Sequence, residues 1–346
     1  MFLNSELFGH QRGASNKGYK KIKYGTMVLS TQNLHLGNAN VNLRFKNGMV
    51  SPAYKTYDIT GCSIELLAHW IKSDAAKHFF YNATTVGASM CRRNVEWKTL
   101  YEQPLFLPST DEQDKIASFL SFLTQRIDAQ QKYVATLKKY KRGLQNRFFF
   151  KRSHLSPKAS EIDSHDVEPL GSVVHINPKT GSLPEAFIYI DLECVESGVL
   201  NSKKLISRNS APSRAQRLLE EGDLLYQMVR PYQKNNYYFQ KGFEYPTVAS
   251  TGYAQIRCSE MDTQFIYEQL SSDYFAREAM LRSTGTGYPA INADDLAEIP
   301  IWVPPLNQQE KIGAALSFLG EKIEVHQKLL SALCSVKSSL LQQLFI

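Results

Sequence analysis

The chain has 346 residues, of which 43% are hydrophobic and 21% charged. This length fits two domains, and the composition excludes collagen-like, low-complexity and wholly disordered chains. Lys and Arg outnumber Asp and Glu by 40 to 33, and the net charge of +7 hints at a polyanionic partner without identifying one. No apolar run reaches the roughly 20 residues that cross a bilayer, and the first residues do not resemble a signal peptide, so we expect a cytoplasmic protein. Five scattered cysteines without a C-x-x-C pair favour free thiols over a disulfide framework or a zinc knuckle.

Residues 1–107 form the first predicted globular domain. Gly25 precedes a strand-like run at Thr26–Ser30, and a helical stretch passes through Trp70 and Phe79. A proline-bearing segment then separates this domain from the next predicted element.

A long helix is predicted within residues 108–152. The side chains of Asp111 and Glu112 suit its first turn, where backbone N–H groups are free and the helix end is positive. Apolar residues then step by four and three over about five heptads, which is typical of a coiled-coil seam. These positions are Ile116, Leu120, Leu123, Ile127, Val134, Leu137, Leu144 and Phe148. At 1.5 Å per residue such a helix is roughly 60 Å long.

The end of this helix carries a run of basic residues with no acid among them. The run comprises Lys132, Lys138, Lys139, Lys141, Arg142, Arg147, Lys151 and Arg152. It is equally well explained as a solvated helix face or as a contact to DNA phosphates.

Residues 165–303 form the second predicted globular domain, with short β-rich runs at Phe187–Tyr189 and Asp223–Val229 and a helical stretch at Gln264–Leu281. The mixture predicts an α/β fold, more strictly α+β. The loop that follows Arg230 combines basic, amide and tyrosine side chains, which can contact phosphates, base edges and base faces. Composition alone favours an ordinary polar loop over a loop that contacts DNA. Ser283–Leu296 lacks the Lys–Ser/Thr of a phosphate-binding glycine loop and is interpreted as a connection to the next helix.

A second long helix is predicted within residues 304–346, because Pro304–Phe345 repeats Pro108–Phe149 without a gap at an offset of 196 residues. Its seam repeats the apolar positions of the first helix. They are Ile312, Leu316, Leu319, Ile323, Leu330, Leu333, Leu340 and Leu344. The simplest arrangement pairs the two helices with each other, and homodimerisation through both seams is the alternative.

Two seam positions are polar in both copies, first Gln130 and His326, then Lys141 and Lys337. A polar seam residue lowers stability but fixes the register of a coiled coil. We therefore interpret His326 as a spacer in the seam rather than as a metal ligand.

The first globular domain also echoes the second, but more faintly. Over fifty residues separate Val167 from Gly222 in the second domain, whereas 24 residues precede the corresponding Gly25. The first domain is therefore expected to be shortened at its N-terminal side.

The sequence shows no pattern for catalysis. An Asn/Asp-Pro-Pro-aromatic run for methyl transfer is missing, and Asp191 and Glu193 have no neighbouring lysine that would complete a nuclease site. We expect no cofactor, no metal and no enzymatic activity of the chain itself.

A domain, a long helix, a similar domain and a similar helix resemble the specificity subunit of type I restriction-modification systems. The resemblance covers nearly the whole chain and is strongest in DEQDKIASFLSFLTQRID, NQQEKIGAALSFLGEKIE, EEGDLLYQMVRPY, STGYAQIR and GTGYPAINADDLAEIPIWVPPL. It implies two target-recognition domains that each read half of a split DNA sequence, separated by two long helices that pair as an antiparallel coiled coil. It also implies double-stranded DNA and methyltransferase subunits as partners, with restriction subunits in some complexes. Because the chain repeats itself, it can bind two identical methyltransferase subunits.

These observations give two sets of candidate residues. The candidate DNA contacts are Arg230, Tyr232, Lys234, Asn235, Asn236, Tyr237, Tyr288 and Asn292 in the second domain, and Asn33, Asn38, Arg92, Arg93 and Asn94 in the first. The candidate helix-pairing residues are Ile116, Leu120, Leu123, Ile127, Val134 and Leu137, with Ile312, Leu316, Leu319, Ile323, Leu330 and Leu333. The alternative function is a coiled-coil scaffold whose globular ends bind other proteins.

Overall fold

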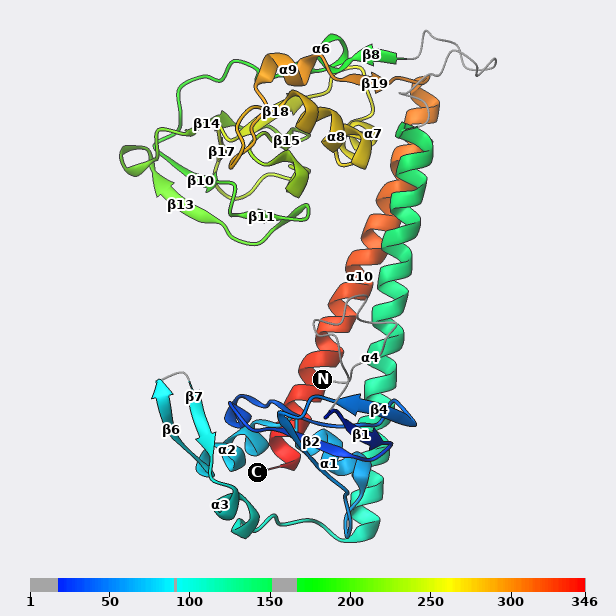
Figure 1. Ribbon diagram of the computed structural model, residues 1–346. Coiled ribbons are helices and arrows are strands. Elements are labelled where there is room, and N and C mark those ends of the chain that lie inside the picture. The colour runs from blue at the N-terminus through cyan, green and yellow to red at the C-terminus, as the bar shows by residue number, and fades with distance from the viewer. Residues whose placement is uncertain (1–17, 90–91, 151–166, 346) are drawn as a thin grey trace. The chain divides into compact units, whose positions relative to one another are not determined.

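The computed structural model describes residues 18–89, 92–150 and 167–345, with side chains for all of these except 87–89 and 92. The chain divides into two compact units. Unit 1 holds the residues up to Tyr133 together with those from His326 onward, and unit 2 holds Val134–Val325. Each unit combines one globular part with one portion of two long helices (Figure 1). No helix in the described ranges has the length and apolar character needed to cross a membrane.

The globular part of unit 1 is built from short strands followed by short helices. Its elements are β1 (Lys20–Lys23), β2 (Met27–Ser30), β3 (Ala39–Val41), β4 (Asn47–Val50), β5 (Tyr54–Tyr57), α1 (Ile64–Trp70), α2 (Asp74–Asn82), β6 (Thr84–Ser89), β7 (Arg92–Val95) and α3 (Trp97–Glu102). Strands β3, β2 and β5 form an antiparallel sheet, β1 pairs with β4, and β6 pairs with β7.

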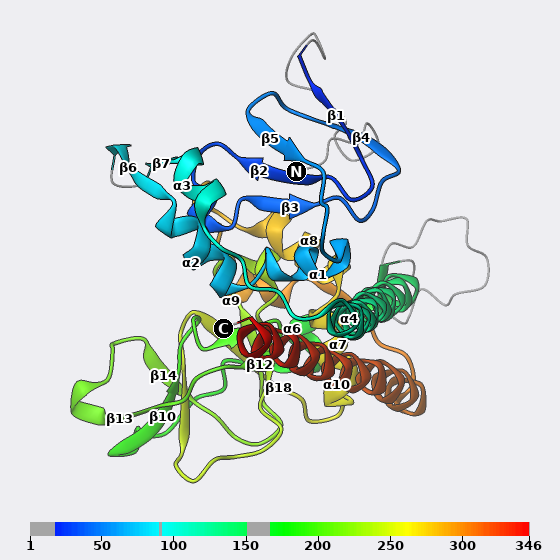
Figure 2. The same cartoon turned by 90° about the horizontal axis from the view of Figure 1, so that it is seen from below.

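Helices α1 and α2 lie on one side of the β3–β2–β5 sheet (Figure 2). Serine side chains fix where each begins, because the hydroxyl of Ser63 accepts the N–H of Leu66 and that of Ser73 accepts the N–H of Ala76. Between sheet and helices lies an apolar core. It contains Leu29, Leu34, Val41, Leu67, Trp70, Ile71, Phe80 and Leu100.

The globular part of unit 2 is larger and richer in strands. Its elements are β8 (Val167–Pro169), α6 (Leu170–Val173), β9 (His175–Ile176), β10 (Ala186–Ile190), β11 (Val195–Glu196), β12 (Val199–Leu200), β13 (Lys204–Ser207), β14 (Ala215–Leu218), β15 (Leu224–Gln227), β16 (Tyr237–Tyr238), β17 (Thr247–Ser250), β18 (Tyr253–Arg257), α7 (Thr263–Leu270), α8 (Asp273–Arg282), α9 (Ala293–Ala297) and β19 (Pro300–Trp302).

Two four-stranded sheets organise unit 2. One has the order β16-β15-β18-β9, and the other has the order β13-β10-β17-β14, in which only β10 and β17 run parallel. Helices α7 and α8 pack with the first sheet around the largest apolar core of the chain, which includes Tyr226, Phe265, Phe275, Ile301 and Trp302. The mixed strand and helix content agrees with the predicted α/β, more strictly α+β, class.

The prediction of one helical stretch at Gln264–Leu281 is wrong, because this part of the chain forms two helices, α7 and α8. Helix α7 ends at Leu270, and the side chain of Ser272 accepts the N–H of Phe275 and begins α8. The same break occurs in unit 1, where Ser73 begins α2. A serine that can bond the backbone ahead of it starts a new helix rather than continuing the old one.

The two long helices are α4 (Thr110–Gln145, 36 residues) and α10 (Leu306–Leu344, 39 residues). The side chain of Glu112 accepts both the N–H and the hydroxyl of Ser109, which satisfies the free groups at the start of α4. Gly143 does not interrupt α4, which continues into a π-helical turn at Asn146–Phe150. Lys151 and Arg152 of the basic run lie outside the described residues.

The long helices pair antiparallel. In unit 1, Gln130 meets His326, and Thr124, which is earlier in α4, meets Lys337, which is later in α10. The seam residues Leu120, Leu123, Ile127, Val134, Leu137, Ile312, Leu316 and Ile323 are buried. Ile116, Leu319, Leu330 and Leu333 are partly buried. The helices therefore form the antiparallel coiled coil that the four-three spacing and the resemblance implied.

The repeat extends into the globular parts. Sheet β3-β2-β5 of unit 1 corresponds to β16-β15-β18 of unit 2, and β1 pairs with β4 as β14 pairs with β17. Among the described residues of unit 1, strands β10 to β13 have no counterpart. The expectation that the first domain is shortened ahead of Gly25 stays a prediction, because residues 1–17 lie outside the described residues. The predicted boundaries 1–107, 108–152, 165–303 and 304–346 stay predictions.

Candidate nucleic-acid interface

The loop selected from the sequence of unit 2 is a tight turn. Arg230 and Lys234 have positive φ angles of 55° and 53° and enclose a 3₁₀ turn at Pro231–Gln233. Left-handed backbone costs a non-glycine residue about 1 kcal/mol or more, so other contacts must hold it. The N–H of Arg230 donates to the carbonyl of Pro289 at 2.7 Å, and the N–H of Lys234 donates to the carbonyl of Pro231 at 3.1 Å.

This turn brings Arg230 onto an exposed tyrosine. The guanidinium carbon of Arg230 lies 4.2 Å from the ring centroid of Tyr288, which is 69% exposed. Tyr232, on the same turn, is 53% exposed. Within the described residues, the Nε atom of Arg230 is buried and has no hydrogen-bond acceptor. A cation held against an aromatic face, beside a second open ring, can receive a phosphate or a base.

Three other residues of the loop face the protein. The ammonium of Lys234 pairs with Asp273, which also binds Arg142. The side-chain oxygen of Asn235 accepts the N–H of Ser197 at 3.0 Å. Asn236 is 2% exposed, and its amide bonds the N–H of Gln227 and the carbonyl of Leu270. In this structure these side chains hold the turn in place.

The charge of Asp273 is stabilised by its two partners. Burial opposes ionisation, but hydrogen bonds from Lys234 and Arg142 hold the pKa of this carboxyl below its usual value. Lys141, next to Arg142, likewise pairs with the buried Glu268 at 2.8 Å. These two members of the basic run on α4 thus bind acids of unit 2.

Two further candidates of unit 2 have structural roles. Tyr237 lies in β16, where burial raises the pKa of its phenol. Asn292 caps α9, since its side-chain oxygen accepts the N–H of Asp295 at 2.7 Å.

In unit 1 the structure brings Asn33, Arg93 and Asn94 together. Asn33 lies ahead of a 3₁₀ turn at Leu34–Leu36, and its side-chain oxygen accepts the N–H of Arg93 at 3.4 Å. The guanidinium of Arg93 donates twice to Thr84 at 2.7 Å and stacks 4.1 Å from the Tyr81 ring.

Asn94, Asn38 and Arg92 lie in or beside strands of unit 1. Asn94, in β7, is exposed, and its backbone forms an isolated antiparallel bridge with Gln32. Asn38 is exposed just before β3. Arg92 begins β7, and its side chain lies outside the described part of the structure.

The two units contain turns of the same construction. Asn33 and Gly37 have φ angles of 55° and 80° around their 3₁₀ turn, as Arg230 and Lys234 have around theirs. The N–H of Asn33 donates to the carbonyl of Arg93, as that of Arg230 donates to Pro289. The sequences NLHLG and RPYQK share no residue, so sequence similarity does not reveal that the turn is repeated. Asn33 and Gly37, which tolerate positive φ, are the sequence signal for the turn of unit 1.

Sequence reasoning also missed an aromatic cluster in unit 1. The ammonium of Lys55 lies 3.7 Å from the centroid of Trp97, and Tyr57 and Tyr101 join their hydroxyls at 2.7 Å beside it. The residues are more than 40 positions apart, so no local pattern reveals them. In the described part of the chain, no cluster of His, Cys, Asp and Glu is arranged to hold a metal ion.

Comparisons with known proteins agree with this architecture. The family described as type I restriction modification DNA specificity domain matches residues 191–334. The specificity subunit of the type I restriction enzyme MjaVIII of Methanocaldococcus jannaschii is 25% identical over 310 residues, which cover 85% of this chain and 69% of that protein. The putative MjaX specificity subunit of the same organism is 24% identical over 346 residues, which cover 95% of this chain and 74% of that one.

A solved structure shows the same fold. The type I restriction-modification S subunit from M. genitalium superposes with a TM-score of 0.57 at 19% identity, covering 96% of this chain and 87% of its own. With the duplicated helix, the duplicated turn and these likenesses, the chain is similar to specificity subunits of type I restriction-modification systems over most of its length.

Proposed function

We propose that the chain reads a two-part DNA sequence, one part with each unit, and performs no chemistry itself. The observation that carries this proposal is the duplicated turn, in which left-handed residues enclose a 3₁₀ turn in both units. Two recognition domains that carry the same kind of turn suit a DNA target made of two half-sites.

In unit 2 the reading group consists of Arg230, Tyr232 and Tyr288. An arginine can bond two acceptors of a guanine in the major groove, and exposed tyrosines can stack or donate. In unit 1 the corresponding group is Asn33, Asn38 and Asn94, whose amides can pair with adenine. Arg93 supports this group by holding Thr84.

The long helices are the spacer in this proposal. Seam residues are buried along α4, and the polar contact between Gln130 and His326 selects one register. The distance between the half-sites then follows from the helix length.

The helices also offer two equivalent docking surfaces for methyltransferase subunits. Phe122 in unit 1 and Phe318 in unit 2 occupy the same position of the repeat and are 66% and 64% exposed. Val336 and Tyr140, again repeat equivalents, are 51% and 57% exposed at the same levels of the helix pair. Exposed apolar side chains at matched positions suit two copies of one partner. Methyl transfer and any DNA cleavage belong to the partner subunits.

The test is DNA binding by the chain with its methyltransferase, followed by mapping of methylated sites across a genome. We expect one split sequence with a fixed gap, and an affinity that falls steeply with salt. Methylation of a single undivided sequence would contradict two readers. Binding that ignores sequence while the chain still captures other proteins would favour the scaffold function. The chain alone, given DNA, S-adenosylmethionine and magnesium, is expected to produce no reaction.

A further inference from the structure

Strand β5 and helix α3 of unit 1 hold a lysine against aromatic rings. In this aromatic cluster the ammonium of Lys55 lies 3.7 Å from the centroid of the Trp97 ring and donates to the hydroxyl of Tyr101 at 3.4 Å. The hydroxyls of Tyr57 and Tyr101 lie 2.7 Å apart. A cation and two hydroxyls therefore meet at one place on the surface of unit 1.

The positive charge of the cluster has no carboxylate partner within residues 18–89, 92–150 and 167–345. Asp58, the acid nearest to Lys55 in sequence, pairs instead with Lys23 at 3.4 Å. The ring of Trp97 attracts the ammonium but carries no net charge. The cluster can therefore still bind an anion.

The tyrosine hydroxyls can add hydrogen bonds to such an anion. Burial, and next the bond to Tyr101, raise the pKa of the Tyr57 phenol, so this hydroxyl keeps its proton at neutral pH. When Tyr57 donates to Tyr101, the proton of Tyr101 is left for another acceptor. Tyr101 is 58% exposed, so that acceptor can come from outside the chain.

Unit 2 has small or apolar residues at the equivalent positions. Strands β2 and β15 both begin two residues after a glycine with positive φ, and β5 and β18 pair with them in the same register. The bridges Gln32–Asn94 and Val229–Ala290 align the segments that precede α3 and α9. The equivalent pairs are Lys55 and Ala254, Tyr57 and Ile256, Trp97 and Ala293, and Tyr101 and Ala297. Ala254 and Ile256 are completely buried in the core of unit 2, so the aromatic cluster is specific to unit 1.

The net charges of the two globular parts also differ. Residues 18–109 include 11 Lys and Arg and 5 Asp and Glu, whereas residues 167–305 include 12 Lys and Arg and 17 Asp and Glu. DNA carries one negative charge per about 1.7 Å of its axis. The globular part of unit 1 is therefore the better partner for the DNA backbone.

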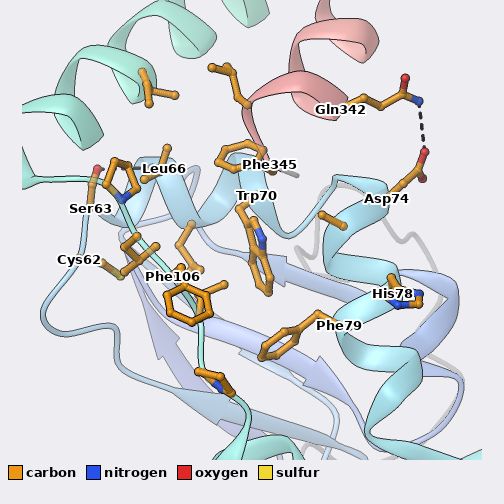
Figure 3. A pocket seen from close by; sticks show the side chains of 18 of the residues that line it. Cys62, Ser63, Leu66, Trp70, Asp74, His78, Phe79, Phe106, Gln342 and Phe345 are labelled. Atoms are coloured by element: carbon orange, nitrogen blue, oxygen red, sulfur yellow. Dashed lines mark hydrogen bonds between the residues drawn. The ribbon is translucent and has the colours of Figure 1, made fainter.

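The apolar groove of unit 1 does not suit the same ligand. This groove has a volume of about 610 Å³. Figure 3 shows aromatic side chains around it, those of Trp70, Phe79, Phe106 and Phe345. Its lining also includes the carboxylate of Asp74, which accepts a bond from Gln342 at 3.3 Å. Apolar walls and a carboxylate disfavour an anion.

We propose that Lys55, Tyr57 and Tyr101 form a binding site for a DNA phosphate in unit 1, and that unit 2 makes no equivalent contact. The inference rests on the proposed function and adds to it a contact outside the duplicated turn. Trp97 follows Asn94 of the reading group by three residues, which span at most about 10 Å, or about three base-pair steps of DNA. The phosphate is therefore one that lies next to the half-site read by unit 1.

The salt dependence of DNA binding tests this site, because each phosphate contact adds about 0.9 to the slope of log affinity against log salt concentration. The full chain with its methyltransferase is titrated with its preferred DNA and with unrelated DNA at several salt concentrations. Lys55→Gln should weaken binding to both DNAs several-fold and make both slopes shallower by about one. A lower folded fraction changes the amount of active protein but not the slope, so misfolding cannot imitate this result.

Three further variants separate charge from hydrogen bonding. Lys55→Arg keeps the cation and should retain the slope. Tyr101→Phe keeps the ring but removes the hydroxyl, so it should weaken binding to both DNAs alike at an unchanged slope. Lys115→Gln removes an exposed lysine of α4 in unit 1 and should change neither the affinity nor the slope.

An unchanged slope in Lys55→Gln would overturn the phosphate site. A loss of affinity for the preferred DNA alone would also overturn it, since the cluster would then contact a base. Normal DNA binding with weaker methyltransferase assembly would assign the cluster to an acidic group of that partner instead. In each of these cases the unaltered chain keeps its sequence preference, whereas failure of the proposed function would appear as the absence of that preference in the unaltered chain.

Discussion

Gln130 and His326 are equivalent positions of the internal repeat, and they bind each other. The side-chain amide of Gln130 lies 2.9 Å from Nδ1 of His326 and donates to its backbone carbonyl, also at 2.9 Å. In an antiparallel pair of identical helices, equivalent residues can meet only at the midpoint of the shared length. The duplication has therefore placed a polar contact between two equivalent residues at the point that decides the register of the helix pair.

Replacing Gln130 by alanine should destabilise the helix pair. The change removes two hydrogen bonds and leaves a carbonyl and a ring nitrogen without their partner, which costs about 1 to 3 kcal/mol. The free energy of unfolding, measured in urea, checks this. Gln131→Ala, on the exposed side of the same turn, should have little effect.

The double variant Gln130→Leu/His326→Leu should regain stability but lose its single register, because leucine seams tolerate several alignments. Cysteine cross-linking between α4 and α10 at fixed positions would detect more than one alignment. A double variant with one register would show that the apolar seam alone sets the alignment.

A buried glutamine joins each long helix to its globular part. The side-chain oxygen of Gln113 accepts the N–H of Ser63 at 2.8 Å, and its amide donates to the carbonyl of Pro108. Gln309 makes the same two bonds, to Asp262 and Pro304. Gln113→Ala and Gln309→Ala should each cost about 2 to 4 kcal/mol, because buried backbone groups lose their partners.

Hydrogen exchange locates this effect. Gln113→Ala should increase exchange at the start of α1, and Gln309→Ala at the start of α7, each without affecting the other unit. Gln308→Ala, which is exposed, is the control. Equal exchange throughout in all three variants would show that other contacts hold these junctions.

The stability of unit 1 should fall in mild acid because of His69. Burial and, secondarily, the charge of Lys337 lower the pKa of His69 to about 4, against the smaller opposing effect of Glu65. The folded state therefore favours the neutral ring, which is 9% exposed and bonds the hydroxyl of Ser121. Stability is complete above the unfolded pKa of about 6.5 and is lost as the pH falls towards 4, by on the order of 2 to 3 kcal/mol.

Urea unfolding at pH 7.5 and pH 5 tests this expectation, with the fluorescence of Trp70 and Trp97 as the signal of unit 1. His69→Gln should reduce the difference between the two pH values. His175→Gln, an exposed histidine of unit 2, should leave it unchanged. An undiminished acid loss in His69→Gln would assign the effect to other groups.

The exposed phenylalanines of the long helices predict how many partners dock. Phe122→Asp and Phe318→Asp should each remove one of two methyltransferase subunits, because a charge at an apolar docking residue costs several-fold to a hundred-fold in affinity, or about 1 to 3 kcal/mol. Mass measurement of the assembled complex counts the subunits. Gln125→Asp adds the same charge at another exposed position and should leave the count intact. Loss of both subunits in either single variant would contradict independent sites.

The sequence predicted well those features that depend on periodicity. The seam from Leu120 to Leu137 and the polar pair at Gln130 and His326 follow from spacing alone, because helix geometry is fixed and the partner is a copy of the same helix. The break before Ser272 was missed, since the apolar pattern of Gln264–Leu281 continues across it.

The candidate site was predictable only in part. Composition located the loop after Arg230, but Lys234 and Asn236 turned out to bind Asp273 and Leu270, which lie on helices distant in sequence. Whether a polar side chain faces solvent or supports its own turn depends on such distant partners. No local pattern contains that information.

Arg230 is the residue on which sequence reading by unit 2 should depend most. Its guanidinium stacks on Tyr288, and removing a base-contacting arginine costs about 1 to 3 kcal/mol of discrimination. Arg230→Ala should therefore weaken binding to the preferred DNA roughly ten-fold to a hundred-fold while changing binding to unrelated DNA little. Titrations on both DNAs at two salt concentrations measure the ratio. Arg208→Ala, an exposed arginine of the same unit, should lower both affinities alike or neither. If Arg230→Ala also lowered both alike, Arg230 would be a phosphate contact, and base reading in unit 2 would lie elsewhere.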